Sequence, residues 1–285
     1  MDYRQRKQTI IVSILAGVLI LVLAWVYFGW FYQPAGCFDN KQNQGETGVD
    51  CGGPCALSCE RLTIKPVEAL WSRAVPLKEN AYDLVAQVNN PNPNFGLGQV
   101  KYNFKVYDSG NQLLAQKSGV DYILPGQKKY LIEANVALAK TPAKVEIIID
   151  AAAKADWQEL KDNFESPDIY VHDKQFKYLE GQTGVAQASG IIKNNSQFDF
   201  DKISVAVVLF DENKDIVGVN KTVALTIPAG EERYFAVLWY DALPGQVKSA
   251  DMLADTNLFS DANFMRRYGT QQKFQEYQTS ATPAY

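Results

Sequence analysis

An unbroken apolar run, residues 10–31, constrains this chain more than any other part of its sequence. The run contains no charged residue, and as a helix rising about 1.5 Å per residue it would be roughly 33 Å long, enough to cross a bilayer's hydrocarbon core. Because lipid offers the backbone no hydrogen-bond partners, a single span must be helical. Its end carries the aromatic residues typical of the headgroup level, namely Trp25, Tyr27, Phe28, Trp30, Phe31 and Tyr32. The sequence therefore predicts a transmembrane helix over residues 9–32.

The charges beside this run predict its orientation. Arg4, Arg6 and Lys7 precede it, whereas acidic residues dominate the stretch that follows. Basic flanks stay in the cytoplasm. We therefore expect residues 1–8 to be cytoplasmic and the remainder extracytoplasmic, in a single-pass cell-membrane protein whose partner through residues 9–32 is the lipid bilayer.

Three other interpretations of the N-terminus remain open. A cleavable signal peptide has a shorter apolar core and a small-residue exit, whereas this core is long and its exit is aromatic. A lipoprotein signal would use the small residues before Cys37, but lipidation there would leave an odd number of cysteines. A buried core helix would also be apolar on all sides. A membrane anchor is the preferred interpretation.

Composition excludes several classes of function. A net charge of −4 gives no electrostatic basis for binding nucleic acid. The single histidine, His172, removes most histidine-based triads, metal sites and proton relays. The sequence contains no phosphate loop, G-x-S-x-G elbow or H-E-x-x-H motif. We therefore expect no nucleic-acid partner and no catalytic residues, and predict that the protein is not an enzyme.

All four cysteines lie in one short segment after the apolar run, at Cys37, Cys51, Cys55 and Cys59. An even number of clustered cysteines on the oxidising side of a membrane favours two disulfides. Four cysteines allow three connectivities, and the sequence does not choose among them. A tetrathiolate zinc site is the alternative. We expect residues 33–60 to form a small disulfide-rich stalk, because so short a segment buries too little apolar surface to hold its shape without covalent closure.

Acidic and amide side chains lie between these cysteines, at Asp39, Asn40, Asn43, Glu46 and Asp50. Hard oxygen ligands at short spacing in a glycine-containing loop can wrap a calcium ion, although the EF-hand pattern is not met. The same side chains also cap turns through their own backbone, which is the favoured interpretation. No other cofactor is expected. The segment resembles the motif C-x-[DN]-x-x-x-N-x-x-E-T-x-V-D-C-G-G-x-C-x-x-C of bacterial surface and secreted proteins, with three residues rather than two before the last cysteine.

From residue 61 onward the sequence predicts strands, because apolar and polar residues alternate between turn signals. Such strands are half buried in an antiparallel sheet. Features of the first half recur at an offset of about 104 residues: Asn89-Asn90, Tyr107-Asp108 and Leu124-Pro125-Gly126 return as Asn194-Asn195, Phe210-Asp211 and Ile227-Pro228-Ala229-Gly230. The predicted fold class is therefore mainly β, with two tandem immunoglobulin-like β-sandwiches at residues 61–166 and 167–268.

One strand in each half carries a recognisable motif. Phe104-Lys105-Val106-Tyr107-Asp108 resembles the F-x-L-Y-D signature of bacterial FxLYD domains, with Val in place of Leu, and a looser second match ends in Leu209, Phe210 and Asp211. The resemblance implies sandwich modules with a binding or spacing role in envelope-attached proteins, and no catalytic residues.

A short helical pattern follows each predicted sandwich. Trp157, Leu160 and Phe164 share one helical face, and the second set is Leu258, Ala262 and Met265. We expect the Trp157 helix to pack against the base of a sandwich and join the modules as a rod, rather than form an exposed connector. Residues 269–285, rich in Gln, Thr, Ser and Ala, are predicted to be a disordered tail.

These features predict a membrane-anchored, extracytoplasmic binding or assembly protein of the cell envelope that acts by tethering and protein–protein contact. The sequence does not identify its envelope or surface protein partner. A carbohydrate-binding surface protein is the alternative, since exposed aromatic rings stack on sugars. Trp239 and Tyr240 are the candidate ligand contacts.

Overall fold

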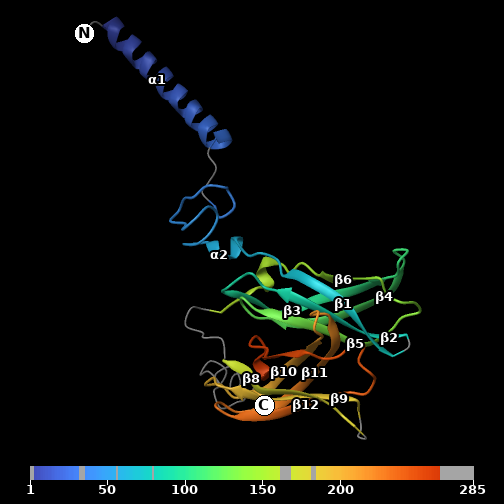
Figure 1. Cartoon of the computed structure of the whole chain (residues 1–285). Coiled ribbons are helices and arrows are strands. Elements are labelled where there is room, and N and C mark those ends of the chain that lie inside the picture. Colours follow the sequence, from blue (N-terminus) through green and yellow to red (C-terminus); the bar gives the residue numbers. More distant parts are fainter. Residues whose placement is uncertain are drawn as a thin grey trace, which may run out of the picture. The chain divides into compact units, whose positions relative to one another are not determined.

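The computed structural model describes residues 3–31, 36–55, 57–78, 80–160, 168–180 and 184–263, which belong to two compact units, residues 1–64 and residues 65–285 (Figure 1). The predicted fold class is confirmed: the described chain is mainly β, with an N-terminal apolar helix, a disulfide-closed segment and antiparallel sheets stacked as sandwiches. The predicted tail lies outside the described residues, as do Phe164 and Met265.

The first unit begins with helix α1 (Tyr3–Val26), which continues as the π-helical turn η1 (Tyr27–Phe31). The stretch Arg6–Gly29 is long and apolar enough to cross a membrane, and it is not buried against protein. A helix that is apolar on all sides is typical of a buried core or a membrane span. The unit ends with the short helix α2 (Cys59–Leu62), which follows the disulfide-closed segment.

The second unit contains two sandwiches, each made of two antiparallel sheets. In the first sandwich, one sheet has the order β1-β2-β5 and the other the order β4-β3-β6, with β7 paired to β3. The strands are β1 (Glu68–Lys78), β2 (Ala81–Asn89), β3 (Phe95–Tyr107), β4 (Leu113–Ile123), β5 (Lys128–Ala137), β6 (Lys144–Ile149) and β7 (Gln158–Glu159). The two sheets meet where the Ser72 hydroxyl donates to the Val145 carbonyl at 2.8 Å.

The second sandwich has the strand order of the first, with sheets β8-β9-β12 and β11-β10-β13. Its strands are β8 (Ile169–Tyr178), β9 (Ala186–Asn194), β10 (Phe200–Phe210), β11 (Ile216–Ile227), β12 (Glu232–Trp239) and β13 (Ser249–Asp255). Its core takes side chains from all six strands, including Ile192, Ile203 and Met252. The order of features that recurs in the sequence therefore corresponds to the same order of strands.

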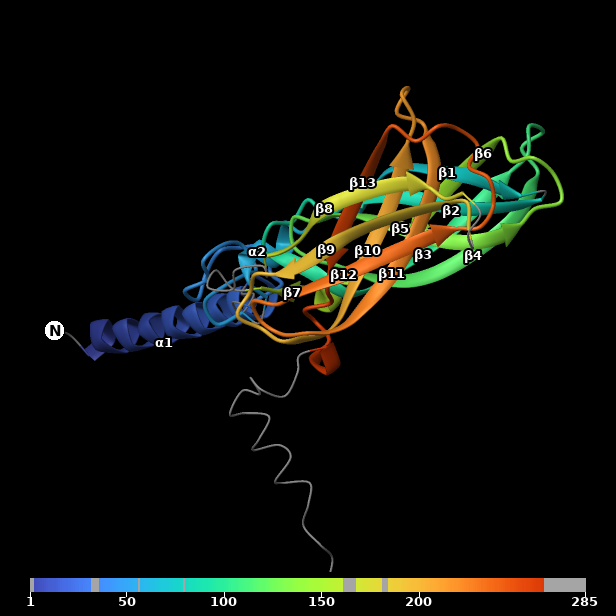
Figure 2. The ribbon, with the colours of Figure 1, turned by 60° about the horizontal axis from the view of Figure 1, so that its bottom comes forward.

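The two sandwiches pack face to face rather than end to end. Val75, Val85 and Ile132 of sheet β1-β2-β5 share one buried cluster with Val208 and Val219 of sheet β11-β10-β13. Figure 1 shows the first sandwich lying along the second, and Figure 2 brings sheet β12-β9-β8 forward as the outermost layer. The expected rod is therefore wrong, because an apolar sheet face, and not a linker helix, joins the modules.

The central strands β2 and β10 are consequently buried on both faces. Val85 and Val208 face the neighbouring sandwich, while Leu84 and Leu209 fill the interior of their own, and all are fully buried. The expectation of half-buried strands is therefore wrong for these two. Near-continuous apolar runs are typical of strands buried on both sides.

The helix predicted from the spacing of Trp157, Leu160 and Phe164 does not form over its described part. Residues Lys154–Asp156 make a single 3-10 turn (η2), Trp157 is extended, and β7 follows and pairs with β3. Trp157 is nevertheless buried, as expected, with 3% of its surface exposed. After the second sandwich, Asp261–Asn263 is again only a 3-10 turn (η3).

The recurring Asn-Asn and Pro-Gly motifs hold the loops of each sandwich together. The buried Asn90 amide donates to the carbonyls of Phe95 and Leu124, and the buried Asn194 amide donates to those of Phe198 and Ile227. Each asparagine thus satisfies carbonyls on two loops that the strand ladders leave unpaired.

Candidate functional site

The disulfide-closed segment adopts one of the three connectivities that the sequence allowed. Cys37 pairs with Cys55 and Cys51 pairs with Cys59. The zinc alternative is contradicted, because all four sulfurs are engaged in disulfides. Cys37, Glu46 and Cys55 lie close enough to suggest a metal site, but two of these residues form one disulfide. No cofactor is shown at this segment.

The side chains considered as calcium ligands accept hydrogen bonds from their own loop. Asp50 accepts the backbone N–H groups of Asp39 and Asn40, and Asp39 accepts that of Lys41 and the side-chain amide of Asn43. The bond from Asn43 lowers the pKa of Asp39. Glu46 is buried and accepts the N–H groups of Asn43 and Asp50. In this arrangement the carboxylates cap turns.

Backbone conformation and close contacts explain why the motif has two consecutive glycines. Gly52 and Gly53 have φ of +70° and +57°, the left-handed region that favours glycine. A Cβ on Gly53 would also collide with the Gly45 carbonyl oxygen, and one on Gly52 with the Thr47 side chain. The Gly-Gly pair therefore allows the chain to turn between the two disulfides.

The residues of the FxLYD-like motif are structural. Phe104 and Leu209 are fully buried in the sandwiches. Asp108 accepts the N–H groups of Gly110 and Gln112, and Asp211 caps its own turn in the same way. The backbone bond from Gln112, with the Lys140 ammonium, lowers the pKa of Asp108. The half-exposed Tyr107 and Phe210 precede these two caps.

The expectation that Trp239 contacts a ligand is wrong. Its ring lies in the core of the second sandwich with 4% of its surface exposed, and its Nε1 donates to the Val219 carbonyl at 3.2 Å. Tyr240, the next residue, is 65% exposed. Alternation along β12 explains the difference, because adjacent side chains point to opposite faces of a strand.

A cleft of about 920 Å³ opens between the two sandwiches. One wall comes from β5 and the end of β4, and the other from β10, β11 and the end of β13. Val120 and Val223, which line opposite walls, are 60% and 44% exposed. Interfaces between modules are one of the places where binding sites occur.

Lys129 forms the centre of a buried charged cluster beside this cleft. Its Nζ lies 2.8 Å from Asp121 and 3.1 Å from Asp255, in ion pairs whose angles do not suit hydrogen bonds, and only 8% of its side chain is exposed. It also lies 3.3 Å from the centre of the Tyr122 ring. A buried ammonium requires such partners, because its removal from water is costly.

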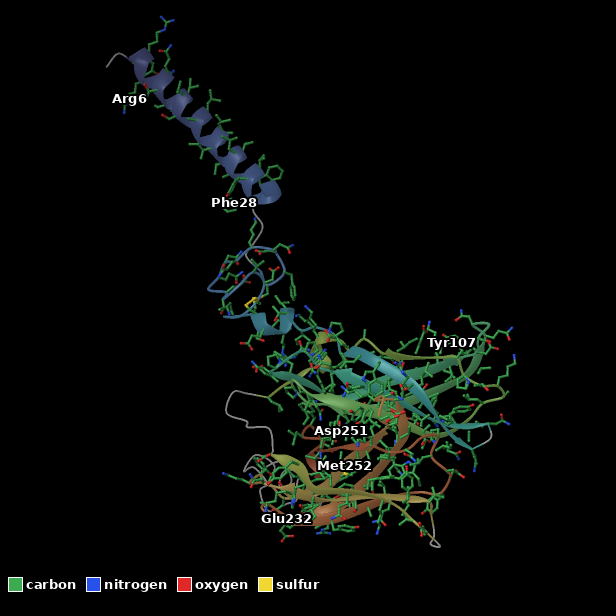
Figure 3. The ribbon with its side chains drawn as sticks, viewed as in Figure 1. Arg6, Phe28, Tyr107, Glu232, Asp251 and Met252 are labelled. Carbon is green, nitrogen blue, oxygen red and sulfur yellow. A yellow bond between two sulfur atoms is a disulfide. The ribbon has the colours of Figure 1, made fainter. Side chains whose placement is uncertain are left out.

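Two carboxylates of β13 accept hydrogen bonds from side chains of the first sandwich. Asp255 accepts the Tyr122 hydroxyl and the Gln127 amide, each at 2.7 Å, and Asp251 accepts the Tyr130 hydroxyl at 2.8 Å. Burial, together with the charge of Asp255, raises the pKa of the Tyr122 phenol. Asp251 is labelled in Figure 3, on the strand that faces the first sandwich.

Neither this cluster nor the cleft was predicted from the sequence. Lys129 directly precedes Tyr130 in a strand where polar and apolar residues alternate. A lysine at such a polar position is expected to face solvent. Its partners come from β4 of the first sandwich and from β13 of the second. The acidic residues spaced through residues 251–255 were the only available signal.

Comparison with known proteins assigns no family. No protein-family model matches the chain. No curated protein matches it. Among solved structures, a transglutaminase from red sea bream is 8% identical with a TM-score of 0.23, and the alignment covers 67% of this chain and 29% of that one. The chain thus spans less than a third of the transglutaminase, and a likeness this low supports no argument about function.

Proposed function

We propose that this protein is a membrane-anchored, extracytoplasmic binding or assembly component of the cell envelope, and that the cleft between its sandwiches receives an envelope or surface protein. The observation that carries the proposal is the cleft, whose walls belong to two sandwiches joined by one apolar cluster. Because the walls are joined in this way, a partner would meet a preformed surface.

The anchor is proposed to be α1, with the N-terminus in the cytoplasm. Arg4 and Lys7 on its first turns support this orientation, as basic flanks stay inside. The two disulfides also support it, since such bonds persist on the oxidising side of a membrane. The mechanism is then tethering, in which the anchor raises the effective concentration of any partner on the same surface.

We favour binding over catalysis because the charged groups beside the cleft are engaged with one another. Lys129, Asp121 and Asp255 form a closed set of ion pairs, which suits a fixed wall better than a proton donor or acceptor. We also propose that each sandwich is an FxLYD-like module, on the support of the motif residues and their shared turn caps.

Site-directed photo-crosslinking in cells tests the cleft. A photoreactive residue at Val120, in the cleft wall, should give a discrete crosslinked protein product that remains after the cells are washed. The matched control is Leu113, which lies on the same strand β4, is 52% exposed and does not line the cleft. Equal products from both positions, or none from Val120, would contradict a partner in the cleft.

A further inference from the structure

The outer face of sheet β12-β9-β8 presents aromatic side chains to solvent. Core residues such as Val171, Ile192 and Phe235 point into the second sandwich, so the residues that alternate with them point outward. The outward set includes Tyr170, His172, Ile191 and Tyr234. Tyr170 is 44% exposed and Tyr234 62% exposed. This face lies away from the first sandwich (Figure 2).

The register of the strands places these side chains in one strip across the sheet. His172 pairs with Ile191, and Ile191 pairs with Tyr234 on the next strand. The rings of Tyr170 and His172 lie 6.1 Å apart at one end of the strip. With neighbouring strands about 4.8 Å apart, Tyr234 lies roughly 10 Å across the sheet from that end.

The Tyr234 ring lies along the sheet rather than standing on it. Its hydroxyl accepts a hydrogen bond from the Gln187 side chain at 3.2 Å. Gln187 lies four residues along β9 from Ile191, the cross-strand partner of Tyr234. Four residues of a strand span about 13 Å, so the two side chains meet only if both extend along the surface. The Tyr234 side chain therefore extends along the outer surface of the sheet and stays 62% exposed.

Hydrogen-bonding groups of both charge signs flank the strip. Glu232 of β12, labelled in Figure 3, lies 3.3 Å from Lys193 and 3.6 Å from Nε2 of His172. The other ring nitrogen of His172 lies 3.2 Å from Asp173. The strip thus combines flat rings with polar groups and lacks the concentrated single charge that attracts a charged polymer.

We propose that this strip binds a flat, extended, uncharged polysaccharide of the β-1,4-linked kind, with sugar rings stacked on Tyr234 and Tyr170. Aromatic rings match the apolar faces of sugars, while Lys193, Glu232 and Gln187 supply partners for their hydroxyl groups. Two rings separated by the width of three strands suit a chain of several sugars better than a single sugar. The proposal does not depend on the cleft or on a protein partner there.

Calorimetric titration of the full chain with two hexamers tests the proposal. The probes are the β-1,4-linked hexamers of glucose and of N-acetylglucosamine, and the protein is held in a detergent that has no sugar head group. Wild type should bind at least one of them, and Tyr234→Ala and Tyr170→Ala should each weaken binding by about tenfold, as expected for one lost stacking contact. Tyr234→Phe keeps the ring and should bind within about twofold of wild type.

Tyr178→Ala is the matched control, because Tyr178 lies on the same strand, is 53% exposed and aligns with the buried Ala186 on the opposite face. It should leave binding unchanged. Failure of wild type to bind either hexamer, or equal binding by Tyr234→Ala, would overturn the proposal. Self-association that Tyr234→Ala abolishes, without saccharide binding, would assign the face to a second copy of the chain and would also overturn it.

Discussion

Replacing Asp255 with alanine should separate the energetics of the interface between the sandwiches from those of the sandwiches themselves. The substitution removes an acceptor from the Tyr122 hydroxyl and the Gln127 amide, each at 2.7 Å, and an ion-pair partner from Lys129 at 3.1 Å. Lys129 would keep Asp121, its partner at 2.8 Å. Removing one partner of a buried pair typically destabilises a protein by about 3–5 kcal/mol.

A loss of this size is large against the ordinary stability of a domain, about 5–15 kcal/mol. At about 2–4 °C per kcal/mol for a unit of this size, the melting midpoint should fall by roughly 6–20 °C. Thermal unfolding of the full chain in detergent at neutral pH measures the shift. Asp201→Ala is the control, because Asp201 also lines the cleft but is exposed, and it should change stability by less than about 0.5 kcal/mol.

The interaction itself can be isolated with a second substitution. Lys129→Met removes the charge that Asp255 pairs with, so the loss for Lys129→Met with Asp255→Ala should be smaller than the sum of the two single losses. A cost below about 1 kcal/mol for Asp255→Ala, or strict additivity of the two substitutions, would refute the reasoning that this cluster holds the interface.

Four further outcomes are expected. Trp157→Ala should lower stability by about 3–5 kcal/mol in thermal unfolding, since a buried indole is lost; a change below about 0.5 kcal/mol would mean an exposed connector. The oxidised chain should show no free thiol and should gain four on reduction and denaturation, whereas alkylation of the native chain would contradict the disulfides. Chelation should leave the melting of the disulfide segment unchanged, because Asp39 and Asp50 already accept its backbone amides; a lower midpoint would reveal a calcium site. Burial raises the pKa of Asp83, so its contribution to stability is present at low pH and lost as pH rises through that pKa; Asp83→Asn should therefore gain stability relative to wild type as pH rises above the ordinary aspartate pKa of about 3.9, and a constant difference would contradict this.

The elements that could be predicted from the sequence depend on local patterns. The apolar run is a helix because its composition and length are features of contiguous residues, and the strands follow from alternation and turn residues. The Asn90 and Asn194 loops recur because in each the asparagine side chain donates hydrogen bonds to nearby backbone carbonyls. Disulfides were expected from clustering, but their pairing depends on how the loop turns at Gly52 and Gly53.

The features that could not be predicted arise where distant segments meet. Lys129 belongs to the first sandwich and its partner Asp255 to the second. The residues around each in the sequence therefore do not indicate that the two form a pair. The helical spacing of Trp157 and Leu160 was misleading, because the pairing of residues 158 and 159 with β3 outweighs an isolated helical turn. Trp239 was expected to be exposed because it belongs to an aromatic cluster. Its side chain instead points from the strand into the core.

Protease accessibility in intact spheroplasts tests the proposed topology, in which α1 is the membrane anchor and the second unit lies outside the cytoplasm. We expect added protease to degrade the chain to a small membrane-bound stub that contains α1, because the proposed orientation puts all but the first few residues on the accessible side. Complete protection in intact spheroplasts, with cleavage only after lysis, would contradict the orientation and with it the proposed envelope function.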